Sequence, residues 1–106
     1  MRSIFYIEKN IFHSTGHSNY RIPSIVTTKH GAVLAFCNDR HETCIDHAPE
    51  SAVSMCRKEI DGGWSEVIDL VNVPGWGNRI GSAVYDAQTD TIFLSATRSP
   101  VSVDKC

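Results

Sequence analysis

The chain has 106 residues, 42% of them hydrophobic and 21% charged, with a formal net charge of −2 and a pI of about 6.2. This composition is typical of one small globular domain rather than of a disordered chain. The small net charge argues against a nucleic-acid or anionic-membrane footprint, so we expect any bound anion to be held by local arginines. No apolar run approaches the roughly 18 residues that a membrane-spanning helix needs.

The N-terminal segment Ser3–Ile7 is apolar, but Glu8 and Lys9 follow it at once. It is too short for the hydrophobic centre of a secretory leader, which takes about 7–15 residues, and no small-residue cleavage site follows. We therefore expect a first strand here and no targeting address in the chain.

Short β-branched or aromatic segments separated by turn residues continue along the chain, without helical periodicity. The expected strands after the first are Ser24–Thr28, Ala32–Cys37, Ser51–Arg57, Ser65–Ile68, Ser82–Asp86 and Thr91–Thr97. The first two form a hairpin through Lys29-His30-Gly31, and the last two form another around Ala87–Asp90. Ala32–Cys37 is apolar on both faces, which predicts a buried inner strand. The intervening stretches Asn38–Glu50 and Val73–Asn78 are expected to be loops.

Two hairpins, a long loop and the turn Asp61-Gly62-Gly63-Trp64 favour an all-β fold made of four-stranded β-propeller blades. At about 40–50 residues per blade the chain holds about two blades, whereas closed propellers have about four to eight. We therefore expect residues 1–106 to be a partial propeller domain, either a fragment or a half-assembly, with open faces and unpaired edges. A small self-contained sandwich is the alternative architecture.

Three polar residues stand out by their position relative to the first hairpin. Arg21 lies at the mouth of a strand in Tyr20-Arg21-Ile22-Pro23, where we expect the proline to keep the arginine extended. Arg40 directly follows the buried partner strand, and Asp46 lies six residues further on. The two arginines should thus meet at one end of the hairpin, which predicts an anion site with a carboxyl group tethered nearby.

This ordered set resembles the opening of the exo-α-sialidases (neuraminidases). The resemblance rests on Tyr20-Arg21-Ile22-Pro23, on an arginine 19 positions after Arg21, and on an aspartate six positions after that. The Ala52–Arg57 strand, the Gly63-Trp64-Ser65 turn and the hairpin Val84–Thr89 keep the family's order, and Ile80–Val84 is most similar to the lysosomal-type branch of the animal sialidases. The resemblance covers about residues 12–97. The family's Asp-box turn is shortened here to Asp61-Gly62-Gly63-Trp64.

The resemblance implies the N-terminal blades, about two, of a six-bladed propeller that removes terminal α-linked sialic acid from glycoproteins, glycolipids or oligosaccharides. Arg21 matches the first of three arginines that grip the substrate carboxylate, and Arg40 matches an arginine lining the pocket near the C4 side of the sugar. Asp46 matches the general acid/base. Sialidases depart from the usual two-carboxylate mechanism by using a tyrosine nucleophile. No cofactor or metal is implied, nor a nucleic-acid partner.

The remaining catalytic groups of the family, namely the nucleophilic tyrosine, its glutamate partner and two further arginines, fall beyond residue 106. Tyr6, Tyr20 and Tyr85 do not match the nucleophile, and we expect them to pack. The chain alone should therefore turn over little substrate and should need the remainder of the propeller for closure. A lysosomal or a cytoplasmic location is open for a full-length parent.

Other readings of the same residues remain open. Arg40 could pair with its neighbour Asp39, and Asp46 could be a solvated loop carboxylate. The whole could be a non-catalytic glycan-binding propeller fragment. Trp64 and Trp76 are expected to pack rather than to stack on sugars.

A metal-dependent or interaction domain is a further alternative, because His41, Cys44 and His47 supply ligand types that suit zinc. His13 and His17 are four positions apart, but Ser14, Thr15 and Gly16 between them are poor helix formers, so the two histidines need not share a helix face. The four cysteines form no C-x-x-C pair, so we expect free thiols, with a disulfide as the alternative. Cys37, within the apolar strand, should be an inert core thiol.

Overall fold

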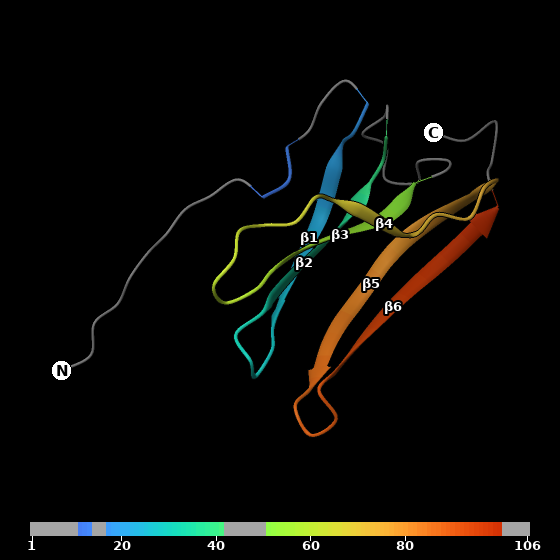
Figure 1. Ribbon diagram of the computed structural model, residues 1–106. Coiled ribbons are helices and arrows are strands. Elements are labelled where there is room, and N and C mark those ends of the chain that lie inside the picture. Colours follow the sequence, from blue (N-terminus) through green and yellow to red (C-terminus); the bar gives the residue numbers. More distant parts are fainter. Residues whose placement is uncertain (1–10, 14–16, 42–50, 101–106) are drawn as a thin grey trace.

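The computed structural model describes residues 11–13, 17–41 and 51–100 (Figure 1). The expected strand Ser3–Ile7 and the residue Asp46 lie outside these ranges. The described chain is all-β, with two antiparallel sheets, as the sequence predicts.

A four-stranded sheet comes first, and its strands are neighbours in the order in which they occur in the sequence. They are β1 (Tyr20–Thr27), β2 (Val33–Asp39), β3 (Ala52–Lys58) and β4 (Ile68–Val71). A two-stranded sheet follows, made of β5 (Trp76–Asp86) and β6 (Thr91–Pro100). The two sheets lie against each other in layers (Figure 1).

The turn between β1 and β2 has the predicted residues and a glycine that the geometry requires. The amide of Gly31 donates to the carbonyl of Thr28 at 3.0 Å, and the amide of Thr28 donates to that of Ala32 at 2.8 Å. Gly31 has φ +86°, and a Cβ placed on it would lie 2.8 Å from Cδ1 of Ile60. A residue with a side chain at this position would therefore have an unfavourable backbone conformation and would clash with Ile60.

The apolar core lies between the two sheets. Val26, Ala32, Leu34 and Phe36 are buried on the face of β1 and β2 that the second sheet covers. The side chains packed against them are Met55, Ile80, Ala83, Tyr85, Ile92 and Leu94. Because side chains alternate along a strand, Ile25, Ala35 and Cys37 lie on the opposite face. We call that face the outer face of the four-stranded sheet.

Polar contacts join the two layers at the end of the molecule that carries the β1–β2 turn. The hydroxyl of Tyr85 accepts from the amide of Lys29 at 3.0 Å and donates to Oδ1 of Asp90 at 2.6 Å. Nζ of Lys29 donates to the carbonyl of Ala87 at 3.0 Å, and Nε2 of His30 lies 3.6 Å from Oδ2 of Asp90. We call this set the hairpin link, because it holds the tips of the two hairpins together.

Several strand boundaries differ from those expected: β1 begins at Tyr20 rather than Ser24, β6 ends at Pro100 rather than Thr97, and β4 and β5 also differ. β4 runs over Ile68–Val71 rather than Ser65–Ile68. Ser65 contacts β3 outside the β3–β4 ladder, beside an isolated bridge between Lys58 and Trp64: its amide donates to the carbonyl of Arg57 at 2.8 Å, and its Oγ accepts from the Arg57 amide at 2.9 Å. β5 begins at Trp76 rather than Ser82, so the predicted loop Val73–Asn78 shrinks to a turn at Pro74-Gly75.

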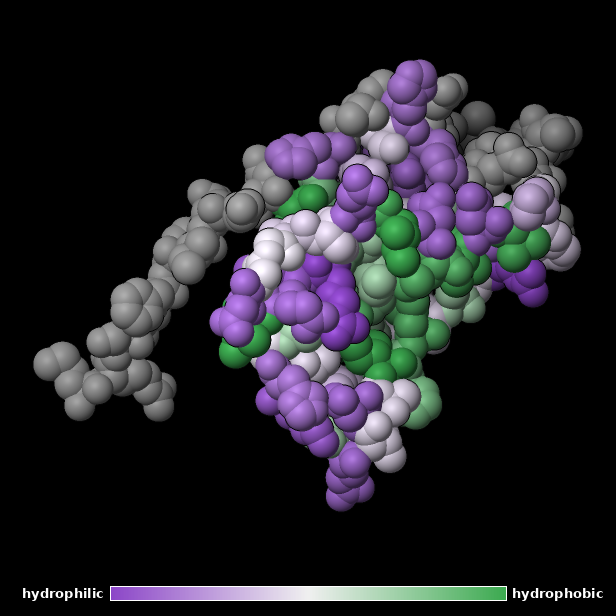
Figure 2. Space-filling view, in the orientation of Figure 1, coloured by the Kyte–Doolittle hydropathy of each residue, from purple (hydrophilic) through white to green (hydrophobic). Residues whose placement is uncertain are grey.

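Hydrophobic side chains form a band along the middle of the visible surface, with hydrophilic side chains on either side (Figure 2). Large apolar side chains stay exposed on several elements, among them Ile25 on β1, Leu70 on β4, Val84 on β5 and Phe93 on β6. No helix in the described ranges is long and apolar enough to cross a membrane.

Candidate functional site

Arg21 and Arg40 lie at the same end of the β1–β2 pair, as the sequence predicts. In the register, Tyr20 stands opposite Asp39 and Arg21 opposite Asn38. The amide of Arg40 then donates to the carbonyl of Asn19 at 2.9 Å, which continues the ladder one step beyond the strands. Arg21 is exposed, whereas Arg40 is buried with 7% exposure. The second arginine is thus fixed by its surroundings, and the first can adapt to a ligand.

Arg21 lies in β1 opposite Asn38, so it is extended as expected, but the reason drawn from Pro23 is wrong. Proline restricts the residue immediately before it, and that residue is Ile22 rather than Arg21. Ile22 has φ +57°, and the register of β1 against β2 shifts between Arg21 and Ser24. A β-branched residue rarely adopts this left-handed conformation. The bulge interrupts the strand just after Arg21 and so re-aims the chain at the mouth of the site.

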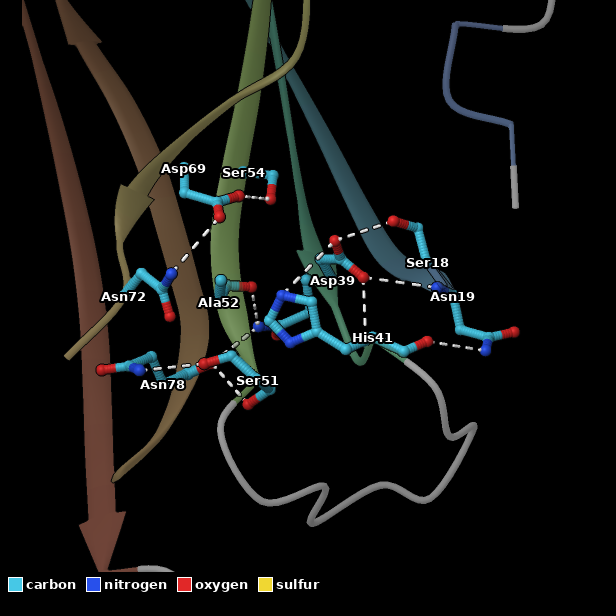
Figure 3. Close-up of polar contacts among 11 residues, drawn as sticks. Ser18, Asn19, Asp39, His41, Ser51, Ala52, Ser54, Asp69, Asn72 and Asn78 are labelled. Carbon is cyan, nitrogen blue, oxygen red and sulfur yellow. Dashed lines mark hydrogen bonds and ion pairs between the residues drawn. The ribbon is translucent and has the colours of Figure 1, made fainter. Parts of the chain in front are cut away.

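The buried carboxylate of Asp39, the residue before Arg40, binds residues on both sides of this end of the hairpin (Figure 3). Its Oδ1 accepts from the amide of His41 at 2.8 Å and from the amide of Asn19 at 3.3 Å. Its Oδ2 accepts from Oγ of Ser18 at 3.2 Å and lies 3.7 Å from Nε2 of His41. One side chain therefore ties the segment before Tyr20 to the segment after β2.

A second network, which sequence reasoning missed, joins the two sheets at this end of the molecule (Figure 3). Nδ2 of the buried Asn38 donates to the carbonyls of Ala52 at 3.0 Å and Asn78 at 2.8 Å, and its Oδ1 accepts from the amide of Ile80 at 2.9 Å. Asn78 is fully buried, and its Nδ2 donates to the carbonyl of Ser51 at 2.9 Å. Its amide also donates to that carbonyl at 3.0 Å, while Oγ of Ser51 donates to the Asn78 carbonyl at 2.9 Å.

No simple motif marks this network. Asn78 follows a Pro-Gly turn and therefore reads as a loop residue, although its side chain fills the junction between the sheets. An asparagine at the end of a buried apolar strand, such as Asn38, was the signal that could have been used, because buried polar groups need partners.

A groove of about 460 Å³ lies on the outer face of the four-stranded sheet, next to Arg21. Phe12 and Tyr20 line it, with their ring centroids 5.2 Å apart, together with Ile25, Ala35 and Cys37. Burial, with smaller contributions from Asp39 and Cys56, raises the pKa of the Cys37 thiol to about 12. Cys37 is thus a protonated thiol facing a mainly apolar groove that has a guanidinium at its rim.

The start of β5 and the end of β6 bring two more arginines to this end of the molecule. The guanidinium of Arg98 lies over the ring of Trp76, 5.6 Å from its centroid, and the indole is 39% exposed. Nη2 of Arg79 donates to Oγ of Ser99 at 2.9 Å, while its buried Nε has no partner among the described residues. Trp76 was expected to pack, and it does so against a cation at the surface rather than in the core.

The metal alternative receives no ligand set from the described residues. Within 11–13, 17–41 and 51–100 there is no group of three or more His, Cys, Asp or Glu side chains that could hold an ion. Cys44 and His47, two members of the suggested set, lie outside those ranges, as does Asp46. Cys37 and Cys56, the described cysteines, are free thiols.

Comparisons with family models, with curated proteins and with solved structures returned no match. The resemblance to exo-α-sialidases therefore rests on the order and spacing of Arg21, Arg40 and Asp46 and on the segments that follow them. In the structure, Arg21 and Arg40 lie at one end of the β1–β2 hairpin.

Proposed function

We propose that this chain forms the N-terminal blades of a six-bladed propeller of the exo-α-sialidase type, an enzyme that hydrolyses terminal α-linked sialic acid. The four-stranded sheet supports the architecture, because strands paired in the order of the sequence make up a propeller blade. The β5–β6 hairpin would begin the second blade. Layering of the two sheets around one apolar core agrees with blade-on-blade packing.

The observation that carries the function is the placement of Arg21 and Arg40 at one end of β1 and β2. Sialic acid bears a carboxylate, and a planar guanidinium binds a carboxylate through two parallel hydrogen bonds without losing its charge at any accessible pH. In the proposed site the exposed Arg21 grips the carboxylate. Arg40, buried and anchored through its backbone to Asn19, lines the sugar pocket.

Asp46 has the role of general acid and base in this proposal. It would protonate the glycosidic oxygen as the leaving group departs and later activate the attacking water. A neutral tyrosine is a fitting nucleophile, because an anionic one would be repelled by the substrate carboxylate. That tyrosine, its glutamate and two more arginines would come from later blades, so we expect binding, but negligible turnover, from residues 1–106 alone.

Binding is tested with saturation-transfer NMR, using N-acetylneuraminic acid as the probe and its methyl ester as the matched ligand without a charge. We expect transfer to the acid, little to the ester, and loss of transfer in Arg21→Ala. Arg98→Ala is the control variant, because it removes an exposed arginine from the same end of the molecule. Equal transfer to acid and ester, or equal losses in the two variants, would contradict the proposed carboxylate grip.

Catalysis is tested in a protein in which this segment is followed by the remaining blades. There, Arg21→Ala and Asp46→Ala should each abolish release of a fluorescent aglycone from a sialoside. Binding of sialic acid without any release would instead support the glycan-binding alternative. Undiminished hydrolysis in Asp46→Ala would refute the acid/base assignment.

A further inference from the structure

Three arginines of the described chain have exposed side chains, and they differ in what holds them. Arg57 forms an ion pair with Glu59 at the end of the sheet that carries the β1–β2 turn. Arg21 and Arg98 are equally exposed but form no ion pair with a described residue. A guanidinium without a carboxylate partner in its own chain keeps its hydrogen-bond donors available for an anion.

Arg98 lies at the same end of the molecule as Arg21, in the other layer. In the register, Arg21 stands opposite Asn38, and Arg98 stands opposite Asn78. The side chain of Asn38 donates to the carbonyl of Asn78 at 2.8 Å, so the two arginines flank a direct contact between the sheets. With about 5 Å between opposite residues of a sheet and about 10 Å between packed sheets, their Cα atoms lie about 10–20 Å apart. This separation suits two acidic groups of one ligand better than a single carboxylate.

The ring of Trp76 fixes the position of the Arg98 guanidinium, whose Cζ lies over it at 5.6 Å from the centroid. Stacking on an indole leaves the donors at the edge of a guanidinium free and limits the rotamers of the side chain. An anion that binds Arg98 therefore loses less free energy to ordering the side chain than it would at an unstacked arginine.

The two-stranded sheet presents Arg98 on the side away from the next blade of the proposed propeller. Trp76 and Arg98 share the side on which Asn78 binds Ser51 of the four-stranded sheet, because residues two apart or directly opposite lie on one face. Packing of the next blade against the other side would therefore leave this guanidinium open to a ligand.

We infer that Arg98 holds a second anionic group of the glycan whose terminal sialic acid carboxylate is bound by Arg21. The substrate class is then a sialylated oligosaccharide with another acidic group on an inner sugar, either the carboxylate of a second sialic acid or a sulfate ester. Each offers a pair of anionic oxygens, the geometry that a planar guanidinium binds through two hydrogen bonds. N-acetylneuraminic acid alone has one acidic group, so the second contact forms only with larger ligands. This role of Arg98 rests on the proposed function, because it takes binding of the terminal sugar by Arg21 as given.

The test compares dissociation constants of matched ligands by NMR titration of the purified chain. The first pair is an α-linked disialoside and the same compound with its inner carboxylate converted to a methyl amide. The second pair is sialyllactose with and without a sulfate on its galactose. In at least one pair, wild type is expected to bind the doubly charged ligand about five- to tenfold more tightly, as a charge-assisted hydrogen bond at an exposed site provides. This advantage should shrink as the salt concentration is raised.

Variants assign the advantage to one side chain. Arg98→Ala should remove it, and Arg98→Lys, which keeps the charge but loses the planar fork, should retain only part of it. Arg57→Ala is the matched control, because it removes an exposed arginine at the opposite end, and it should retain the full advantage. Circular dichroism confirms that each variant is folded.

The results distinguish the role of Arg98 from the proposed function. A loss confined to the Arg98 variants supports the role, and the ligand pair that shows it identifies the second group as a carboxylate or a sulfate. Equal affinities within both pairs, or equal losses in Arg57→Ala and Arg98→Ala, would overturn the role and leave the proposed function standing. If N-acetylneuraminic acid does not bind, or binds Arg21→Ala as well as wild type, the proposed function fails, and the role of Arg98 fails with it.

Discussion

Replacing Asn38 with alanine tests whether the buried network at the arginine end holds the two sheets together. The side chain is 5% exposed and makes three hydrogen bonds, to the carbonyls of Ala52 and Asn78 and from the amide of Ile80. Each of the two donated bonds contributes about 1 kcal/mol net, and leaving the Ile80 amide unsatisfied costs about 1–3 kcal/mol. We expect the free energy of unfolding to fall by about 3–5 kcal/mol, a large share of the roughly 5–15 kcal/mol that stabilises a small domain.

The assay is urea unfolding followed by tryptophan fluorescence, with the slope of the transition compared between variants. Asn72→Ala is the matched control, because Asn72 is exposed and its bond to Asp69 is long, at 3.4 Å. That change should cost less than about 0.5 kcal/mol. If Asn38→Ala cost no more than the control, the network would be a consequence of sheet packing and not a cause of it. A changed slope would show that the sheets no longer unfold together.

Three further predictions concern other parts of the chain. Ile22→Gly should raise the free energy of unfolding by about 0.5–1 kcal/mol, because relief of the left-handed backbone strain, about 1–2 kcal/mol, exceeds the entropy cost of glycine. Urea midpoints measure this, and Ile22→Val, which keeps the strain, is the control. Cys37 should resist alkylation in the folded chain and react once urea unfolds it, because burial raises the pKa of its thiol to about 12; peptide mapping by mass spectrometry measures it, and equal rates in both states would contradict the burial. In the hairpin link, the hydrogen bond from Tyr85 lowers the pKa of Asp90 below 3.8. The pKa of Tyr85 is raised above 10.0, mainly by burial and to a smaller extent by its hydrogen bond to Asp90. The free energy of unfolding should therefore decrease as the pH falls below 3.8 through the folded-state pKa of Asp90. It should also decrease as the pH rises above 10.0 through the folded-state pKa of Tyr85. Urea midpoints measured across this pH range should show both decreases, and Tyr85→Phe should make both smaller.

Local pattern predicts the hairpins of this fold well. The segment Ala32–Cys37 is apolar on both faces, and all of it except Ala32 lies in the buried strand β2. Lys29-His30-Gly31 forms the turn before it. The second hairpin turns at Ala87–Asp90 as expected. In these places the residues that set the structure are neighbours in the sequence, so their order is enough.

The features that escaped prediction depend on distant residues. β5 begins at Trp76 because Asn78 binds Ser51, which lies 27 positions earlier in the sequence. The left-handed Ile22 sits at a bulge against β2 that its own sequence does not announce. For the site, the shared end of Arg21 and Arg40 follows from hairpin geometry alone. The hydrogen bonds that Asp39 accepts from Ser18 and Asn19 could not be predicted in this way, because these residues become neighbours only after β1 and β2 pair.

These contacts give the two arginines different mechanical roles. The sheets are joined at the arginine end by Asn38 and Asn78, at the other end by the hairpin link, and in between by the apolar core. Arg40 directly follows Asp39 at the end of the buried strand β2, so its position is set when the stack forms. Arg21 is exposed and next to a bulge, so a ligand must order its side chain at an entropic cost of up to about 2 kcal/mol. In the proposed site, a ligand carboxylate would offset that cost through bidentate bonding and a neutral ligand would not, so we expect the charge of the ligand to decide whether it binds.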